Sequence, residues 1–209
     1  MTPCPFQTGA LNRPLLRRTL GARLFRGRLR AAIAAVMIVA SIASAQNRVS
    51  EYDVKAAYLF NFGKFVRLTP SDTALKRQSF DFCIVGEDPL GTTLNELTAN
   101  EQLGGEPVRV IRLKAAAEAR GCAIAYISAS EGKLIKADVD ALRGEPVLTV
   151  SDAANFLQHG GMIQFVVVAN HIRFAVNLDA VRSGQLSLSS ELLRVAISVN
   201  GEPPAGVRP

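Results

Sequence analysis

The sequence predicts an α/β fold: a single three-layer domain with a mostly parallel sheet, helices on both faces and a C-terminal antiparallel hairpin at the sheet edge. Three observations support this prediction. Short apolar runs rich in β-branched residues alternate with helical patterns, as in strand–helix–strand crossovers. The runs are apolar almost throughout, for example CAIAYI (Cys122–Ile127), so both of their faces are expected to be buried. The last two runs are only three residues apart, which is too close for a crossover helix.

The first 45 residues have the features of a secretory signal peptide. Seven arginines and no acidic residue precede Ala31. The apolar stretch from Ala31 to Ala45 then ends in an A-x-A pattern before Gln46. A membrane anchor is the alternative, but this stretch is shorter than the ~20 residues needed to cross a bilayer. We therefore predict export by general secretion, with cleavage between Ala45 and Gln46.

Cleavage would change the charge of the protein. The whole chain carries 24 Lys and Arg against 18 Asp and Glu, and loss of the seven arginines leaves 17 against 18, a net charge near −1. The basic excess therefore belongs to the targeting segment, and no basic stripe with interleaved aromatic residues remains to indicate nucleic-acid binding. The mature chain is expected to form one domain over residues 46–199, followed by a flexible tail at 200–209.

A helix is expected first, within residues 49–68. Its apolar residues recur three and four positions apart, Lys55 is assigned to its wetter side, and the helix ends before TPSD (Thr69–Asp72). Four β-rich runs follow, at Phe80–Val85, Val108–Leu113, Ala123–Ile127 and Val147–Val150. Helical patterns separate them, at Pro89–Asn100, Lys114–Arg120 and Glu131–Leu142.

Capping residues mark further helix boundaries. Ser128 and Glu131 in SASE indicate a capping box, in which the serine hydroxyl accepts from a backbone amide and the glutamate bonds back. Ser151 and Asp152 are expected to cap a helix that stops at the HGG motif (residues 159–161). The hairpin strands are then expected at Met162–Val168 and Ile172–Val176, and two short helices at Leu178–Ser183 and Ser189–Ile197.

The motif GEDPLG (Gly86–Gly91) follows the first strand and resembles a phosphate-binding turn. It lacks both the G-x-x-x-x-G-K-[ST] signature and the G-x-G-x-x-G spacing. Glu87 and Asp88 would repel a phosphate, but they suit the positive end of the following helix. We interpret the motif as a capped strand-to-helix turn.

No catalytic residues, cofactor or metal site are indicated, so the chain is not expected to be an enzyme. The two histidines, His159 and His171, lack metal-ligand spacing. His159 is assigned to a helix C-terminus and His171 to the hairpin turn. There is no G-x-S-x-G motif, and Ser189 is best explained as a helix cap.

Cys83 and Cys122 are the cysteines of the mature chain, since Cys4 would leave with the signal peptide. An even count in an exported protein favours a disulfide. Cys83 lies in the first predicted strand and Cys122 opens the third. In a doubly wound sheet of order 2-1-3 these strands are neighbours ~4.8 Å apart, which is compatible with a disulfide. Two buried free thiols are the alternative.

Six stretches are similar to one family, in the order in which the family has them between Glu51 and Ile197. They are YDVKAAYLFNFGKFV, FCIVGEDPLG, GCAIAYIS, PVLTVSD, GGMIQFVVVANHIRFAVNLDAV and SLSSELLRVA. Through them the chain resembles the YfiR-like periplasmic proteins. The resemblance implies a small periplasmic α/β protein that forms homodimers and has no catalytic centre.

The resemblance also implies a function and a partner. It points to a regulator that binds the periplasmic portion of an inner-membrane diguanylate cyclase and inhibits it, lowering cyclic-di-GMP signalling and biofilm formation. Cys83 and Cys122 match the family's structural cysteine pair. A second pair found in some members is absent here, which argues for a stabilising bridge and against a redox switch. The alternative function is a periplasmic small-ligand sensor acting on another membrane signalling protein, such as a sensor kinase, with its ligand at the carboxyl ends of the strands.

Overall fold

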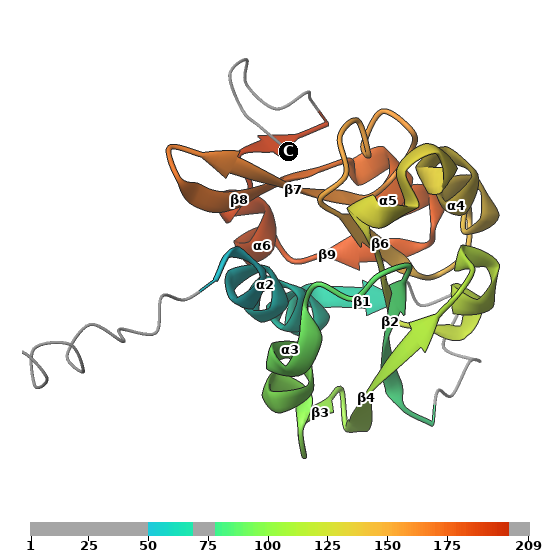
Figure 1. Cartoon of the computed structure of the whole chain (residues 1–209), viewed down its shortest axis with the longest axis vertical. Helices are drawn as coiled ribbons and strands as arrows, with labels where there is room; N and C mark the ends of the chain where they lie inside the picture. Colours follow the sequence, from blue (N-terminus) through green and yellow to red (C-terminus); the bar gives the residue numbers. More distant parts are fainter. Residues whose placement is uncertain (1–49, 69–77, 201–209) are drawn as a thin grey trace, which may run out of the picture. The chain divides into compact units, whose positions relative to one another are not determined.

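An eight-stranded sheet forms the centre of the fold, in the order β10-β8-β7-β6-β5-β2-β4-β3 (Figure 1). The structure is a computed structural model that describes residues 50–68 and 78–200. The predicted signal peptide, its cleavage site and residues 201–209 of the predicted tail lie outside these ranges.

Four parallel strands of the sheet lie at the predicted places. They are β2 (Phe80–Val85), β4 (Glu106–Leu113), β5 (Ile124–Ile127) and β6 (Leu148–Ser151). Their spatial order β4-β2-β5-β6 places the first of them, β2, inside the sheet, as in doubly wound folds. Every residue of β5 and β6 is buried, which explains their continuous apolar sequence.

The hairpin consists of β7 (Ile163–Val168) and β8 (His171–Val176), which pair antiparallel. The two loop residues, Ala169 and Asn170, have φ angles of 47° and 63°, the left-handed conformation that two-residue type I′ turns require. The sequence predicts the hairpin at the edge of the sheet. One further strand, β10 (Ser198–Val199), pairs with β8 and forms the outermost strand on this side.

Helices cover both faces of the sheet, so the predicted fold class is confirmed. Alternate residues of β2 point to the two faces: Phe82 and Ile84 belong to one apolar cluster, Cys83 and Val85 to the other. The first cluster is covered by α2 (Glu51–Phe65), α3 (Gly91–Thr98), α5 (Leu178–Ser183) and α6 (Ser190–Val195). The second is covered by the 3₁₀ helix η2 (Ala116–Gly121) and by α4 (Ile135–Ala141), which follows a second 3₁₀ helix, η3 (Ala129–Leu134).

The first helix, α2, packs closely on the sheet. The ring centroid of Phe62 lies 5.7 Å from that of Phe165 and 5.0 Å from that of Phe174. Gly63 weakens the helix locally, but a Cβ at this position would meet Leu103 Cδ1 at 2.7 Å. Glycine at this position therefore avoids crowding between the helix and Leu103.

Four short strands are absent from the sequence-based prediction: β10, described above, and three others. β1 (Val66–Leu68) follows α2 directly, within the predicted helix, and pairs antiparallel with β9 (Leu186–Leu188) in a separate two-stranded sheet. β3 (Gln102–Leu103) pairs antiparallel with the start of β4. Each has only two or three residues, so pairing and not composition defines it.

The prediction of a helix after Asp152 is wrong, since residues 153–160 form turns. Asn155 has a φ angle of 60°, which an α-helix cannot contain. Ser151 Oγ accepts from the Ala153 N–H at 2.9 Å and so caps a turn.

The capping box predicted in SASE forms only in part. Ser128 is the N-cap residue and its Oγ accepts from the Ser130 N–H at 3.3 Å. The carboxylate of Glu131 instead lies over Gly86, where it would collide with any Cβ.

Candidate functional site

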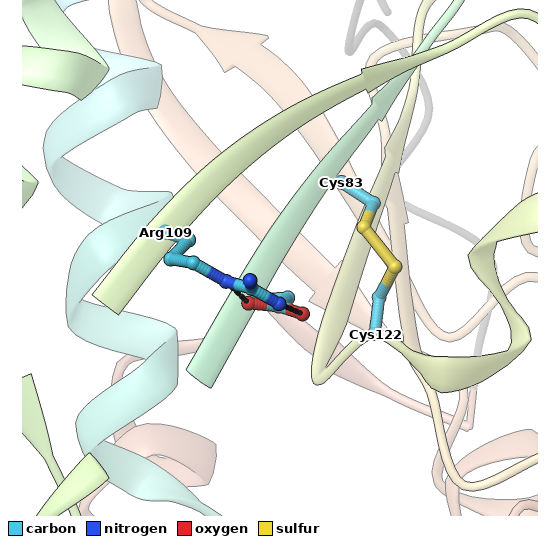
Figure 2. Close-up of a disulfide and its surroundings, with 4 residues drawn as sticks. Cys83, Arg109 and Cys122 are labelled. Carbon is cyan, nitrogen blue, oxygen red and sulfur yellow. Dashed lines mark hydrogen bonds and ion pairs between the residues drawn. A yellow bond between two sulfur atoms is a disulfide. The ribbon is translucent and has the colours of Figure 1, made fainter. Parts of the chain in front are cut away.

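A disulfide joins Cys83 and Cys122, as predicted (Figure 2). Their Cα atoms are 6.1 Å apart. Cys83 lies within β2, whereas Cys122 lies just before β5, which begins at Ile124 and not at Cys122 as predicted. The residue of β5 that pairs with Cys83 is Ala125. The bond therefore runs diagonally between the neighbouring strands.

The position of the disulfide is that of a structural bridge. Cys83 and Cys122 are 0% and 5% exposed, and both pack in the apolar cluster beneath η2 and α4. A soluble reductant would reach the sulfur atoms only after local opening of this face. The bridge closes a loop with a sequence separation of 39, which contributes about 4 kcal/mol in the chain-entropy model.

A buried polar cluster, which we call the Lys55 cluster, lies at the carboxyl ends of β5 and β6. Lys55 Nζ is 2.6 Å from Asp152 Oδ2, and the Tyr126 hydroxyl donates to Asp152 Oδ1 at 2.8 Å. Lys55 Nζ is also 2.6 Å from Glu51 Oε1 and 4.5 Å from the centroid of the Tyr52 ring. These five residues fix the first turns of α2 to the edge of the sheet at which doubly wound proteins usually bind ligands.

Burial and charge keep Lys55 and Tyr126 of the cluster protonated at neutral pH. Burial, followed by the charge of Asp152, raises the pKa of Tyr126 above its usual range. Burial alone would lower the pKa of Lys55, but the hydrogen bonds and charges of Asp152 and Glu51 outweigh it, so this pKa is raised. A charged lysine and a neutral tyrosine are neither bases nor nucleophiles near neutral pH. The arrangement therefore suits structural fixation of α2.

The neighbouring GEDPLG turn is a capped turn, as interpreted from the sequence. Asp88 Oδ1 accepts from the Leu90 and Gly91 N–H groups at 2.9 and 3.0 Å. Asp88 Oδ2 is 2.7 Å from Arg112 Nη2. Both carboxylate oxygens are thus engaged, and the turn would expose an acid to an incoming phosphate.

The other candidate residues have local structural contacts. Ser189 Oγ accepts from the Leu192 N–H at 3.3 Å and caps α6, as predicted. His171 is the first residue of β8, and its Nδ1 is 2.8 Å from Ala169 O. His159 lies in the 153–160 turns, where its N–H donates to Asn155 O at 3.1 Å. Within residues 50–68 and 78–200, no group of three or more His, Cys, Asp or Glu side chains is placed to hold a metal ion.

A pocket of about 400 Å³ lies at the amino ends of β2 and β4, opposite the carboxyl ends where the Lys55 cluster lies. Its lining combines apolar side chains, among them Leu103 and Leu186, with Lys64, Arg67 and Glu106. The sequence-based prediction missed this pocket for two reasons. It placed ligands at the carboxyl ends of the strands, and it did not predict β1, β3 and β9, which contribute lining residues.

These features define a class of protein: a small, disulfide-bridged, doubly wound α/β domain whose polar groups at the usual ligand-binding edge are engaged in internal contacts. The chain belongs to the YfiR/HmsC-like family, whose model matches residues 52–197. This family is periplasmic and regulatory. None of the helices in the described part of the chain is long and apolar enough to cross a membrane.

A crystal structure is among the solved structures that the chain matches. It is the crystal structure of a conserved domain protein from Vibrio cholerae O1 biovar El Tor str. N16961, which is 11% identical in sequence, with a TM-score of 0.47. The superposition covers 72% of this chain and 60% of that one. This chain thus accounts for less than two thirds of the length of that structure. No curated protein matches the chain.

Proposed function

We propose that this protein is a periplasmic regulator that binds the periplasmic portion of an inner-membrane diguanylate cyclase and inhibits it, lowering cyclic-di-GMP and biofilm formation. The observation that carries the proposal is the family match over residues 52–197, which spans almost every described element. The Lys55 cluster supports a binding role over catalysis, because its ionisable groups are committed to holding α2. The protein acts as a homodimer in this proposal.

The proposal includes export of the chain and cleavage between Ala45 and Gln46. The Cys83–Cys122 disulfide supports export, since such bonds persist in oxidising compartments such as the bacterial periplasm and are rare in the cytosol.

Deletion of the gene in its own host tests the function. We expect cyclic-di-GMP and biofilm mass to rise, and plasmid-borne full-length protein to restore both. A variant that begins at Gln46 after a start methionine stays in the cytosol and should not restore them. Unchanged cyclic-di-GMP in the deletion strain, or full rescue by the leaderless variant, would contradict the proposal.

The partner is identified by crosslinking in intact cells. A membrane protein with a cyclase domain should be recovered with the wild-type chain. Recovery of a sensor kinase, with no cyclase, would replace the partner while leaving the regulatory role.

The pocket of about 400 Å³ favours a second candidate function, a small-ligand sensor. In this case the ligand binds at the amino ends of the strands and not at the carboxyl ends. A screen of small metabolites should then find one that raises the melting temperature of the purified protein saturably without a partner. The control is Lys64→Glu, which reverses a charge in the lining and should reduce the shift for an anionic ligand.

A further inference from the structure

The outer edge of β4 is open over most of its length. β3 pairs only with Glu106 and Pro107 at the start of the strand. From Val108 to Leu113, β4 has β2 on one side and no strand of the described residues on the other. Figure 1 shows β4 at this end of the sheet, with β3 beside its start. We call Val108–Leu113 the open edge.

The direction of one hydrogen bond establishes which backbone groups of the open edge are available. The Val108 N–H donates to Glu101 O at 3.1 Å, on the side of β4 away from β2. Because the backbone groups of a strand alternate between its two neighbours, Val110 and Arg112 also direct their N–H and C=O groups away from β2. Arg109, Ile111 and Leu113 direct theirs toward β2.

Two arginines of the open edge, Arg109 and Arg112, have solvent-accessible guanidinium groups. Arg109 Nε and Nη2 donate to the two carboxylate oxygens of Asp81 at 2.8 and 2.7 Å (Figure 2). The Arg109 and Arg112 side chains are 59% and 44% exposed, but their carboxylate partners, Asp81 and Asp88, are only 13% and 15% exposed. Both guanidinium groups thus remain accessible to an acidic group from outside, although each already pairs with an acid of this chain.

We infer that the open edge binds an extended segment of the partner protein, which adds a strand beside β4 and carries acidic side chains near Arg109 and Arg112. The outward backbone groups of Val110 and Arg112, which no strand of the described residues pairs with, provide the hydrogen bonds. The half-buried Val108 and Val110 provide the apolar contacts. This inference rests on the proposed function, because the added strand is a segment of the membrane signalling protein proposed there as the partner.

A second copy of this chain fits the open edge less well. Antiparallel pairing about Val110 would place the Arg109 residues of the two copies in diagonal positions, about 7–8 Å apart. Like charges at that separation oppose self-association, as charged residues on edge strands generally do. An acidic strand removes this repulsion and adds attraction.

Proline substitution tests the backbone part of the inference. Val110→Pro removes an outward N–H, which edge strands tolerate, so the full-length protein should stay folded with a melting temperature within a few degrees of the wild type. Ile111→Pro removes an N–H that bonds to β2 and should prevent folding. In the deletion strain, Val110→Pro should be exported normally and yet fail to lower cyclic-di-GMP.

Charge reversal tests the acidic partner. Arg109→Glu should weaken co-purification of the membrane partner at least tenfold. Lys136→Glu is the matched control, because Lys136 is 65% exposed on α4 and also pairs with one aspartate, Asp140; it should have no effect. A photo-crosslinking amino acid at position 109 should form an adduct with an acidic, extended segment of the partner, and one at position 136 should not.

Four results would overturn the inference. The first two are full lowering of cyclic-di-GMP by Val110→Pro, and equal effects of Arg109→Glu and Lys136→Glu on co-purification of the partner. The other two come from amide hydrogen exchange: slow exchange at Val110 and Arg112 in the isolated monomer, or slow exchange there that appears only when the chain dimerises. The last two would mean that the chain itself, or a second copy, covers the edge. Failure of the proposed function can be told apart from failure of this inference. If the proposed function is wrong, gene deletion leaves cyclic-di-GMP unchanged, whichever protein the probe at position 109 captures.

Discussion

The Lys55 cluster permits a sharp test of how the first helix is held. Replacement of Asp152 by alanine would leave Lys55, only 3% exposed, with Glu51 as its remaining carboxylate partner, and the Glu51 side chain is 48% exposed. It would also remove the acceptor of the buried Tyr126 hydroxyl. Breaking a buried ion pair on one side costs about 3–5 kcal/mol.

The expected result is therefore a loss of about 3–5 kcal/mol in the free energy of unfolding. At about 2–4 °C per kcal/mol for a domain of this size, the melting temperature should fall by about 6–20 °C. Urea denaturation followed by circular dichroism measures the free energy, and a thermal scan measures the melting temperature. Asp179→Ala is the control, because its ion pair with Arg182 is exposed on both sides and should contribute almost nothing.

Two further variants separate this explanation from a local capping role. Asp152→Ser keeps a side chain that caps helices well but carries no charge, so it should be nearly as damaging as alanine. The double variant Lys55→Met/Asp152→Ala removes the unpaired charge and should recover most of the loss. A cost below about 1 kcal/mol for Asp152→Ala, or a double variant as unstable as the sum of the single ones, would refute the reasoning.

Three other predictions concern the disulfide, the packing of α2 and the hairpin turn. Cys83→Ser and Cys122→Ser should each cost about 2–5 kcal/mol in urea denaturation, and the double variant little more; titratable thiols in denatured periplasmic protein would contradict the bridge. Gly63→Ala should lower the melting temperature, since crowding against Leu103, about 1–3 kcal/mol, exceeds the gain in helix propensity; a stabilised variant would contradict it. Ala169→Gly should raise the melting temperature, because Ala169 has a φ angle of 47°; a decrease would argue against the type I′ turn.

The sequence predicts the central strands to within two residues, because their signal is local. Continuous apolar runs rich in β-branched residues mark β2, β5 and β6, and the short gap between Val168 and Ile172 marks the hairpin. The missed strands, β1, β3, β9 and β10, have two or three residues each. No composition distinguishes such short segments from loops, and only the partners that the fold brings beside them make them strands.

The Lys55 cluster was missed for a different reason. Lys55 was assigned to the wetter side of its helix because of its charge, although it stands four and seven positions before Leu59 and Phe62, which are fully buried. This spacing places it on the apolar face. Asp152 was assigned to a local cap because it follows Ser151 directly after a strand. A lysine on the apolar face needs a buried acid, but which acid lies within reach depends on the order of the strands.

The cluster also indicates where a partner can bind this protein. In doubly wound sheets the carboxyl ends of the strands are usually left open for a ligand, but here Lys55 from α2 reaches Asp152 at that edge, and Asp88 is committed to its turn and to Arg112. An incoming ligand would have to displace buried ion pairs, at a cost of several kcal/mol. Recognition is therefore expected elsewhere, and the structure offers two such places: the pocket at the amino ends of the strands and the open edge of β4. Pairing with Val110 and Arg112 would displace no strand, since their outward backbone groups have no strand partner among the described residues.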